Sequence, residues 1–148
     1  ILLTHHHPDH VGGVAALRAT HGCPVFGADD PRIPATHVVR DGDQVAVPSM
    51  DLAFAVWETP GHTRTHLTFV SGDTAFVGDT LFAGGCGRVF EGDPEALYHS
   101  LCRIAALPPE TRVCAAHEYT RDNLRFACSV EPQTAAIRDR YRQVSEAR

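Results

Sequence analysis

The sequence of 148 residues contains no lysine, so all thirteen of its basic residues are arginine. A lysine nucleophile or a lysine phosphate ligand is therefore excluded within this chain. Eighteen acidic residues leave a formal net charge of −5, which disfavours a nucleic-acid surface. No apolar run approaches the roughly 20 residues that a membrane span needs. The five cysteines form no Cys-x-x-Cys pair, and their odd number favours free thiols in a reducing compartment, which predicts a cytoplasmic protein.

The rest of the composition is that of an ordinary globular protein, with 43% hydrophobic and 21% charged residues. A chain of this length is usually one domain and can bury a sizeable core. The sequence begins without methionine, and Ile1 already lies inside an apolar run. We therefore expect the fold to be incomplete at its N-terminal end.

Hydrophobic periodicity and turn signals predict short strands with helices between and after them. We expect strands at residues 1–3, 23–26, 52–57, 67–70, 75–77 and 112–115, with a loop at 28–34 and turns at 41–43 and 71–73. We expect helices at 11–20, 121–129 and 132–146, and another that Asp93 caps and Pro94 opens, with Leu97, Leu101, Ile104 and Ala105 on one face. This order favours helices packed on sheets in layers over a helical bundle.

Histidine is the residue in excess, because the chain has ten and four of them lie between residues 5 and 10. Residues two apart on an extended backbone point the same way, so His5 and His7 can converge on one ion. Asp9 and His10 follow where a helix starts and can turn toward a second point nearby. Imidazole and carboxylate donors together suit zinc, iron or manganese. A solvated loop or a purification tag is the alternative, but Pro8 and Asp9 interrupt the histidine run.

Further candidate ligands follow later strands. His62 lies in Pro-Gly-His-Thr, Asp79 in Gly-Asp-Thr, and His117 in Ala-Ala-His-Glu-Tyr-Thr. Each alone is more often an ordinary loop residue than a ligand. Their order after Thr-His-His-His-Pro-Asp-His makes the combination specific, and it predicts a metal centre built from several loops.

This order of motifs resembles the metallo-β-lactamase superfamily. The resemblance implies a layered α/β fold, an αββα sandwich, with two divalent metal ions at one edge of the sheets. It implies zinc, or iron or manganese in one or both positions. By resemblance, the first ion takes His5, His7 and His62, the second takes Asp9, His10 and His117, and Asp79 bridges them. A metal-bound hydroxide then attacks a carbonyl, with Asp79 and Asp9 as the catalytic carboxylates.

Within the superfamily, the segment Gly-Cys-Gly-Arg-Val-Phe-Glu-Gly and the segment His-Glu-Tyr-Thr resemble glyoxalase II, the hydroxyacylglutathione hydrolases. The resemblance implies glutathione contacts by Arg88, Phe90 and Tyr119, and a metallo-hydrolase that converts S-D-lactoylglutathione to D-lactate and glutathione in methylglyoxal detoxification. It also implies a partial catalytic domain at residues 1–120 and the start of a helical substrate-binding region at 121–148, with the rest of that region missing. We expect a monomer with no membrane or nucleic-acid partner.

Alternative hypotheses stay open at this point. A glutathione persulfide dioxygenase of the same superfamily would use one iron held by His5, His62 and Asp79. A truncated domain could bind metal without activity, and a nuclease is disfavoured by the acidic charge. Thr65 stands where relatives commonly have glycine. His66 beside it either supports a metal ligand or is part of the structure alone, and we favour the structural interpretation. The histidines at positions 6, 21, 37 and 99 are expected in loops or at the surface, without a catalytic role.

Overall fold

The computed structural model describes residues 1–147. Its strands are β1 (Phe26–Gly27), β2 (His37–Val38), β3 (Gln44–Val47), β4 (Leu52–Glu58), β5 (Leu67–Ser71), β6 (Thr74–Gly78), β7 (Leu81–Phe82), β8 (Gly85–Cys86) and β9 (Arg112–Ala115). Its helices are α1 (Pro8–Val11), α2 (Val14–His21), α3 (Pro94–Ala105), α4 (Thr120–Val130) and α5 (Ala135–Glu146), with a 3-10 turn at Pro48–Met50.

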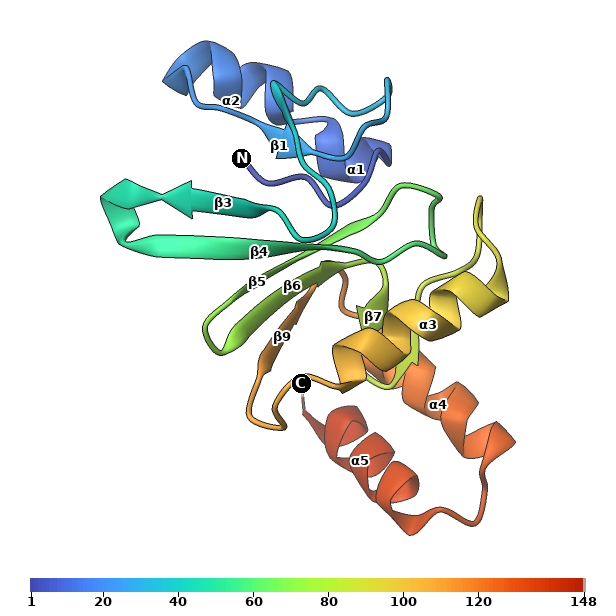
Figure 1. Cartoon of the computed structure of the whole chain (residues 1–148). Helices are drawn as coiled ribbons and strands as arrows, with labels where there is room; N and C mark the ends of the chain where they lie inside the picture. Colours follow the sequence, from blue (N-terminus) through green and yellow to red (C-terminus); the bar gives the residue numbers. More distant parts are fainter. Residues whose placement is uncertain (148) are drawn as a thin grey trace.

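The elements are arranged in layers (Figure 1). The central layer is a five-stranded sheet in the order β3-β4-β5-β6-β9, in which β9 runs parallel to β6 and the other pairs are antiparallel. A small parallel pair, β1 and β2, lies on one side together with α1 and α2, and Leu2 bridges to Phe26 beside it. Helices α3, α4 and α5 lie on the other side. This helix–sheet–sheet–helix order is the layered α/β fold that the motifs led us to expect.

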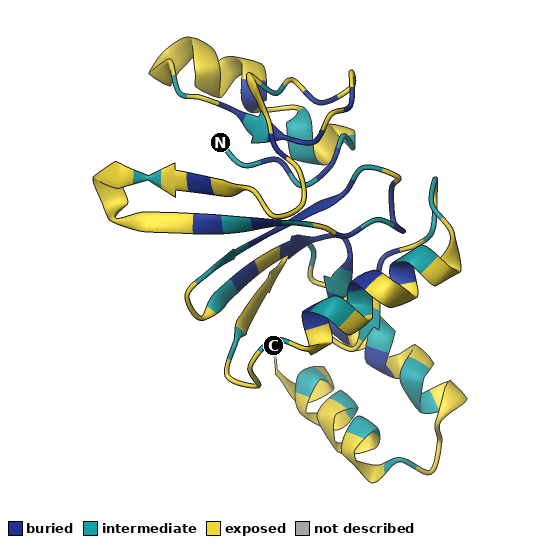
Figure 2. Cartoon of the chain, viewed as in Figure 1, coloured by how far each residue is buried: buried dark blue, intermediate teal, exposed yellow. Residues whose placement is uncertain are grey.

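Apolar residues are buried on both faces of the central sheet, and Figure 2 shows buried residues along its strands. Leu67 and Phe69 of β5 belong to the larger cluster, which includes Leu3 and Val25 of the N-terminal layer. On the helical side, Ala75 and Val77 of β6 pack with Ile104 of α3 in a smaller cluster. Burying apolar side chains on both faces is what fixes the sheet between its neighbouring layers.

Helix α3 begins as its sequence predicts. Asp93 accepts a hydrogen bond from the Ala96 amide at 2.7 Å, and Pro94 occupies the first turn. Leu97 and Ile104 are buried, whereas Ala105 is exposed, so the expected apolar face is narrower than predicted. Within residues 1–147, no helix combines the length and the apolar character that a membrane crossing requires.

Several predicted boundaries were wrong. The helix expected at 11–20 is divided, because α1 ends at Val11 and α2 begins at Val14, after two glycines. The strand expected at 23–26 is instead the short β1, Phe26–Gly27, and the strand expected at 1–3 is only an isolated bridge at Leu2. Strands β7 and β8, two residues each, were not predicted. Two-residue strands carry too little alternation to be recognised in a sequence.

Candidate metal centre

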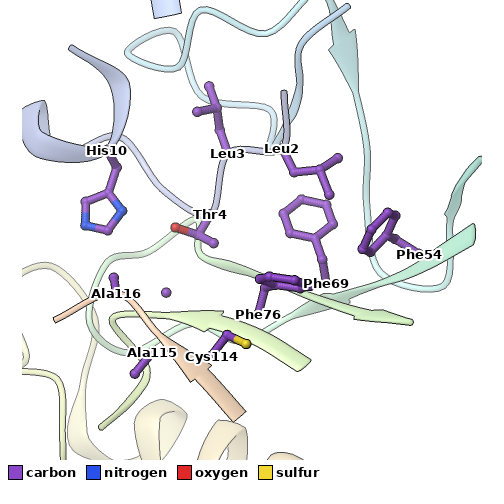
Figure 3. Close-up of a pocket in the computed structure, with 11 residues that line it drawn as sticks. Leu2, Leu3, Thr4, His10, Phe54, Phe69, Phe76, Cys114, Ala115 and Ala116 are labelled. Atoms are coloured by element: carbon purple, nitrogen blue, oxygen red, sulfur yellow. The ribbon is translucent and has the colours of Figure 1, made fainter. Parts of the chain in front are cut away.

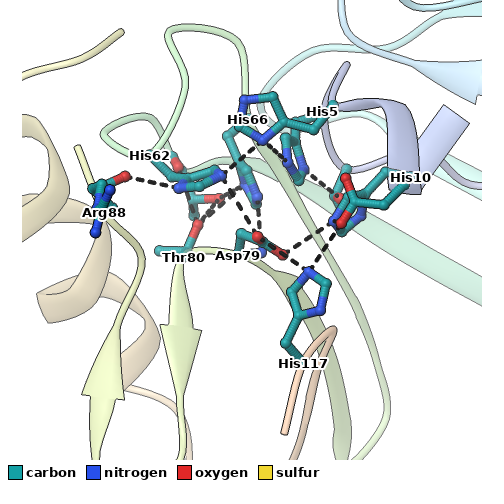
Figure 4. A network of polar contacts seen from close by, with 12 residues as sticks. His5, His10, His62, His66, Asp79, Thr80, Arg88 and His117 are labelled. Carbon is teal, nitrogen blue, oxygen red and sulfur yellow. Dashed lines mark hydrogen bonds and ion pairs between the residues drawn. The ribbon is translucent and has the colours of Figure 1, made fainter. Parts of the chain in front are cut away.

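The candidate ligands come from four loops that meet at one edge of the central sheet (Figure 4). His5 to His10 follow the isolated bridge residue Leu2 and enter α1, and His62 lies in the loop after β4. Asp79 directly follows β6, and His117 follows β9. Because β6 and β9 are parallel neighbours, their carboxyl ends place Asp79 and His117 side by side.

Three histidine side chains form the first cluster. His5 Nε2 lies 3.0 Å from His7 Nδ1, and His62 Nε2 lies 3.1 Å from the same His7 atom. His62 donates its Nδ1 hydrogen to the Arg88 carbonyl at 2.8 Å. That hydrogen bond fixes the tautomer, so His62 Nε2 carries a lone pair that faces the cluster. The three nitrogens are therefore arranged as a set of metal donors.

Asp9, His10 and His117 form the second cluster. His117 Nε2 lies 3.2 Å from Asp9 Oδ2, and His10 Nε2 lies 3.6 Å from that same oxygen. Asp79 stands between the two clusters, because its Oδ2 lies 3.5 Å from both His62 Nε2 and His117 Nε2. All seven predicted ligand side chains thus come together, and Asp79 contacts both groups.

The surroundings of the clusters favour the neutral form of two histidines in the first cluster, whereas the contact with Asp79 raises the pKa of His10 in the second. Burial lowers the pKa of His5 far below its ordinary value, and the neighbouring histidines add to that effect. Burial also lowers the pKa of His7. Burial opposes ionisation of Asp79, but its contacts with His10 and the other histidines outweigh that cost and lower the pKa of Asp79. Neutral imidazoles and an ionised carboxylate are the forms that bind metal ions.

Two buried atoms at the centre test whether this site fits a metal. His10 Nε2 and Asp79 Oδ1 lie 3.2 Å apart, but neither has a partner at hydrogen-bond geometry within the described part of the chain. Buried polar atoms left without partners are costly, and a cation between them would remove that cost. The donor set of imidazoles and carboxylates suits zinc, iron or manganese. The residues present therefore fit a divalent metal centre.

His66 supports the site from behind. Its ring is buried, and burial lowers the pKa of His66 to about 3. Its Nε2 accepts a hydrogen bond from the Asp79 amide at 3.2 Å, and its Nδ1 lies 3.1 Å from both the Thr59 and Thr80 hydroxyls. Because Nε2 is already an acceptor, His66 orients Asp79 and does not point a free donor at the clusters.

The three residues expected to contact substrate surround the clusters. Phe90 is exposed and meets His7 and His62 edge to face, with ring centroids 5.5 and 5.4 Å apart. The Arg88 guanidinium lies 5.7 Å from the centroid of Phe90. Tyr119 is exposed and stacks on His117 at 5.2 Å. Each of these side chains is therefore open to a molecule that approaches the metal ligands.

Sequence reasoning missed how residues between the ligands hold the site. The side chain of His6 is only 10% exposed and lies 3.2 Å from Glu91 Oε1. Neither contact carried a sequence signal, because Asp79 lies 13 positions after His66 and Glu91 lies far from His6 in the sequence. An apolar pocket of about 380 Å³ between the N-terminal segment Leu2–Thr4 and the central sheet adjoins the centre at His10 (Figure 3). Apolar and aromatic side chains dominate its lining.

The layered fold and the two donor clusters define an α/β protein whose residues fit a divalent metal centre. Residues 1–117 match the family model of the metallo-β-lactamase superfamily, and residues 118–148 match that of the hydroxyacylglutathione hydrolase C-terminus. The chain belongs to the metallo-β-lactamase superfamily. The resemblance that the motifs indicated is confirmed.

Individual relatives show which members of the superfamily the chain is similar to. A hydroxyacylglutathione hydrolase of Thiobacillus denitrificans is 52% identical over 143 residues, which cover 96% of this chain and 56% of that relative. The crystal structure of ETHE1 from Myxococcus xanthus is 33% identical with a TM-score of 0.73, covering 99% of this chain and 67% of that one. TTHA1623 in a di-iron-bound form is 34% identical with a TM-score of 0.69, covering 80% of this chain and 69% of that one. The chain spans little more than half the length of the curated relatives it matches.

Proposed function

We propose that this chain carries the dinuclear metal centre of a thioesterase that hydrolyses glutathione thioesters, with S-D-lactoylglutathione as the substrate. The observation that carries the proposal is the pair of adjoining donor clusters that Asp79 contacts together, within reach of three exposed side chains suited to glutathione. The relatives that are about half identical to this chain and are named hydroxyacylglutathione hydrolase support the same reaction.

In this proposal His5, His7 and His62 would hold one ion and Asp9, His10 and His117 would hold the other. Asp79, which contacts both groups, would be shared between them. Zinc is the expected metal, and the di-iron form of a relative makes iron a reasonable substitute. When bound, two such ions make hydroxide available at neutral pH and polarise a carbonyl.

The remaining steps fall to the chain's own side chains. Arg88 supplies a charge-assisted contact to a glutathione carboxylate, and the Tyr119 hydroxyl can donate to a glutathione amide or carboxylate. The Phe90 ring lies against His7 and His62 and covers the apolar part of the thioester. Asp9 is 57% exposed, so it is placed to exchange a proton with solvent during turnover. Residues 121–148 would begin the helical region that completes the substrate site.

A glutathione persulfide dioxygenase with one iron is the competing function. It needs His5, His62 and Asp79 as ligands, and it leaves His7, Asp9, His10 and His117 without a direct metal role. The second donor cluster therefore favours hydrolysis. The two functions also differ in their oxygen source, because hydrolysis consumes water and dioxygenation consumes O₂.

The test is to prepare the full chain with zinc and to follow S-D-lactoylglutathione hydrolysis without O₂. A second arm uses the iron form with glutathione persulfide and measures O₂ uptake. We expect thioester hydrolysis without O₂, its near-complete loss in His117→Ala, and unchanged hydrolysis in His99→Ala, an exposed position on α3. Oxygen uptake with the persulfide, one iron per chain and no thioester turnover would overturn the proposal.

A further inference from the structure

A series of polar contacts joins two loops of the site. The side chains that make these contacts are neither candidate metal ligands nor candidate substrate contacts. The series begins at Thr65, whose hydroxyl donates to Asp30 Oδ2 at 2.7 Å. Thr65 lies three residues after His62 in the same loop. Asp30 belongs to the loop that follows β1, and its carboxylate is 5% exposed. The buried carboxylate thus ties the His62 loop to the loop after β1.

Arg32 carries this connection onward. Its Nε donates to Asp30 Oδ1 at 2.9 Å and its second terminal nitrogen donates to Asp30 Oδ2 at 2.7 Å. The same guanidinium donates to both oxygens of Glu91, one of them at 3.1 Å. One planar fork therefore holds two carboxylates, a geometry that lysine cannot reproduce.

Glu91 links Arg32 to the segment that carries the candidate substrate contacts. It lies next to Phe90, whose amide donates to the His62 carbonyl at 3.1 Å, and its own side chain also contacts His6. The Arg88 carbonyl accepts the His62 Nδ1 hydrogen. Thr65, Asp30, Arg32, Glu91 and the backbone of the segment Gly87–Gly92 thus form a closed ring of contacts around His62.

We infer that Arg32 is a positioning residue, which acts through Glu91 to hold the segment Gly87–Gly92, with Arg88 and Phe90, against His62. The inference rests on the proposed function for what Arg88 and Phe90 bind, but not for the positioning itself. Exposed ion pairs contribute little on their own. Arg32 is different because its side chain, 49% exposed, is shared between carboxylates that are 5% and 29% exposed and that belong to separate loops.

The first experiment measures positioning without substrate. Hydrogen exchange of the metal-loaded full chain is compared between wild type, Arg32→Ala and Arg40→Ala. Arg40 is the matched control, since it pairs with the exposed Asp29 of the same loop and reaches no site residue. We expect exchange of the Phe90 amide to accelerate about tenfold in Arg32→Ala, the change that losing one charge-assisted contact produces. The peptides of β5 and α3 should be unchanged, and so should every peptide of Arg40→Ala.

The second experiment measures the consequence for substrate. Arg32→Ala should raise KM for S-D-lactoylglutathione about tenfold while kcat changes less than about twofold, because substrate contacts move and the metal ligands stay. Glu91→Ala should match it, and the double variant should add nothing further, because both act through one contact. Arg32→Lys keeps the charge and should lie between wild type and Arg32→Ala.

The outcomes separate the two claims. Unchanged exchange at Phe90 together with an unchanged KM in Arg32→Ala would overturn the positioning role. A lower kcat with unchanged KM would also overturn it, because that pattern indicates a smaller folded fraction. If the wild type does not hydrolyse the thioester but Arg32→Ala still loosens the segment, the proposed function fails and the positioning role stands. Should Arg32→Ala not fold, Arg32→Lys and Glu91→Ala decide by the same two measurements.

Discussion

Gly87 offers the sharpest test of how the substrate segment sits on the metal centre. A Cβ atom added to Gly87 would lie 1.9 Å from the Asp79 carbonyl oxygen and 3.0 Å from His62 Nδ1. Contacts under 3.0 Å are essentially never seen for Cβ atoms, so Gly87→Ala must open the gap to Asp79 by about 1.1 Å. The oxygen belongs to the backbone and cannot rotate away. The segment that carries Arg88 and Phe90 must therefore move away from Asp79 and His62.

A displacement of about 1 Å at a reacting centre can reduce catalysis on the order of 10²-fold. We expect Gly87→Ala to lower kcat/KM for S-D-lactoylglutathione by about that factor and to weaken metal retention, since His62 loses its alignment. The control is Gly13→Ala, where an added Cβ meets nothing within 4 Å. Metal analysis, thioester kinetics and the Tm are measured on all three proteins. Wild-type kinetics and metal content in Gly87→Ala would refute this packing argument.

Three further predictions concern single side chains. Asp79→Ala should lose both metals or hold them loosely by metal analysis, because the Asp79 carboxylate contacts ligands of both clusters, whereas His21→Ala should change neither metal content nor rate. Arg88→Ala should raise KM for glutathione thioesters and leave the metal content intact, because substrate binding loses a charge-assisted contact of about 1.5–3 kcal/mol. An unchanged KM would contradict the carboxylate contact. The Arg32 guanidinium holds the pKa of Asp30 below its ordinary 3.8, so ionised Asp30 stabilises the fold above that pH and the contribution is lost as the pH falls through the lowered pKa. The Tm advantage of wild type over Asp30→Asn should therefore shrink below about pH 4, and a constant difference would show that the ion pair does not contribute.

The local signals of the sequence predicted local structure well. Asp93 and Pro94 marked the start of α3, and the alternation at 52–57 and 67–70 marked β4 and β5. The same pattern placed Asp79 and His117 at strand ends, where the structure brings them together. These features depend on residues within a few positions of each other, so a single sequence contains the necessary information.

The features that sequence reasoning missed depend on distant partners. His66 orients Asp79 through an amide 13 positions away, and Arg32 contacts Glu91 across 59 positions. Neither pair has a motif, because any histidine or arginine in a loop looks the same before the chain folds. Short strands such as β7 and β8 depend on a turn at Gly84, whose φ of 72° only the structure reveals.

We propose that metal ions in these two adjoining clusters support hydrolysis of a glutathione thioester. The most direct test of this proposal is the rate of S-D-lactoylglutathione hydrolysis as zinc is added stepwise to the metal-free full chain, without O₂. We expect the rate to rise with added zinc and to reach its plateau at two ions per chain, because both clusters must be filled. A plateau at one ion per chain, or no hydrolysis at any zinc level in a chain that binds the metal, would contradict it.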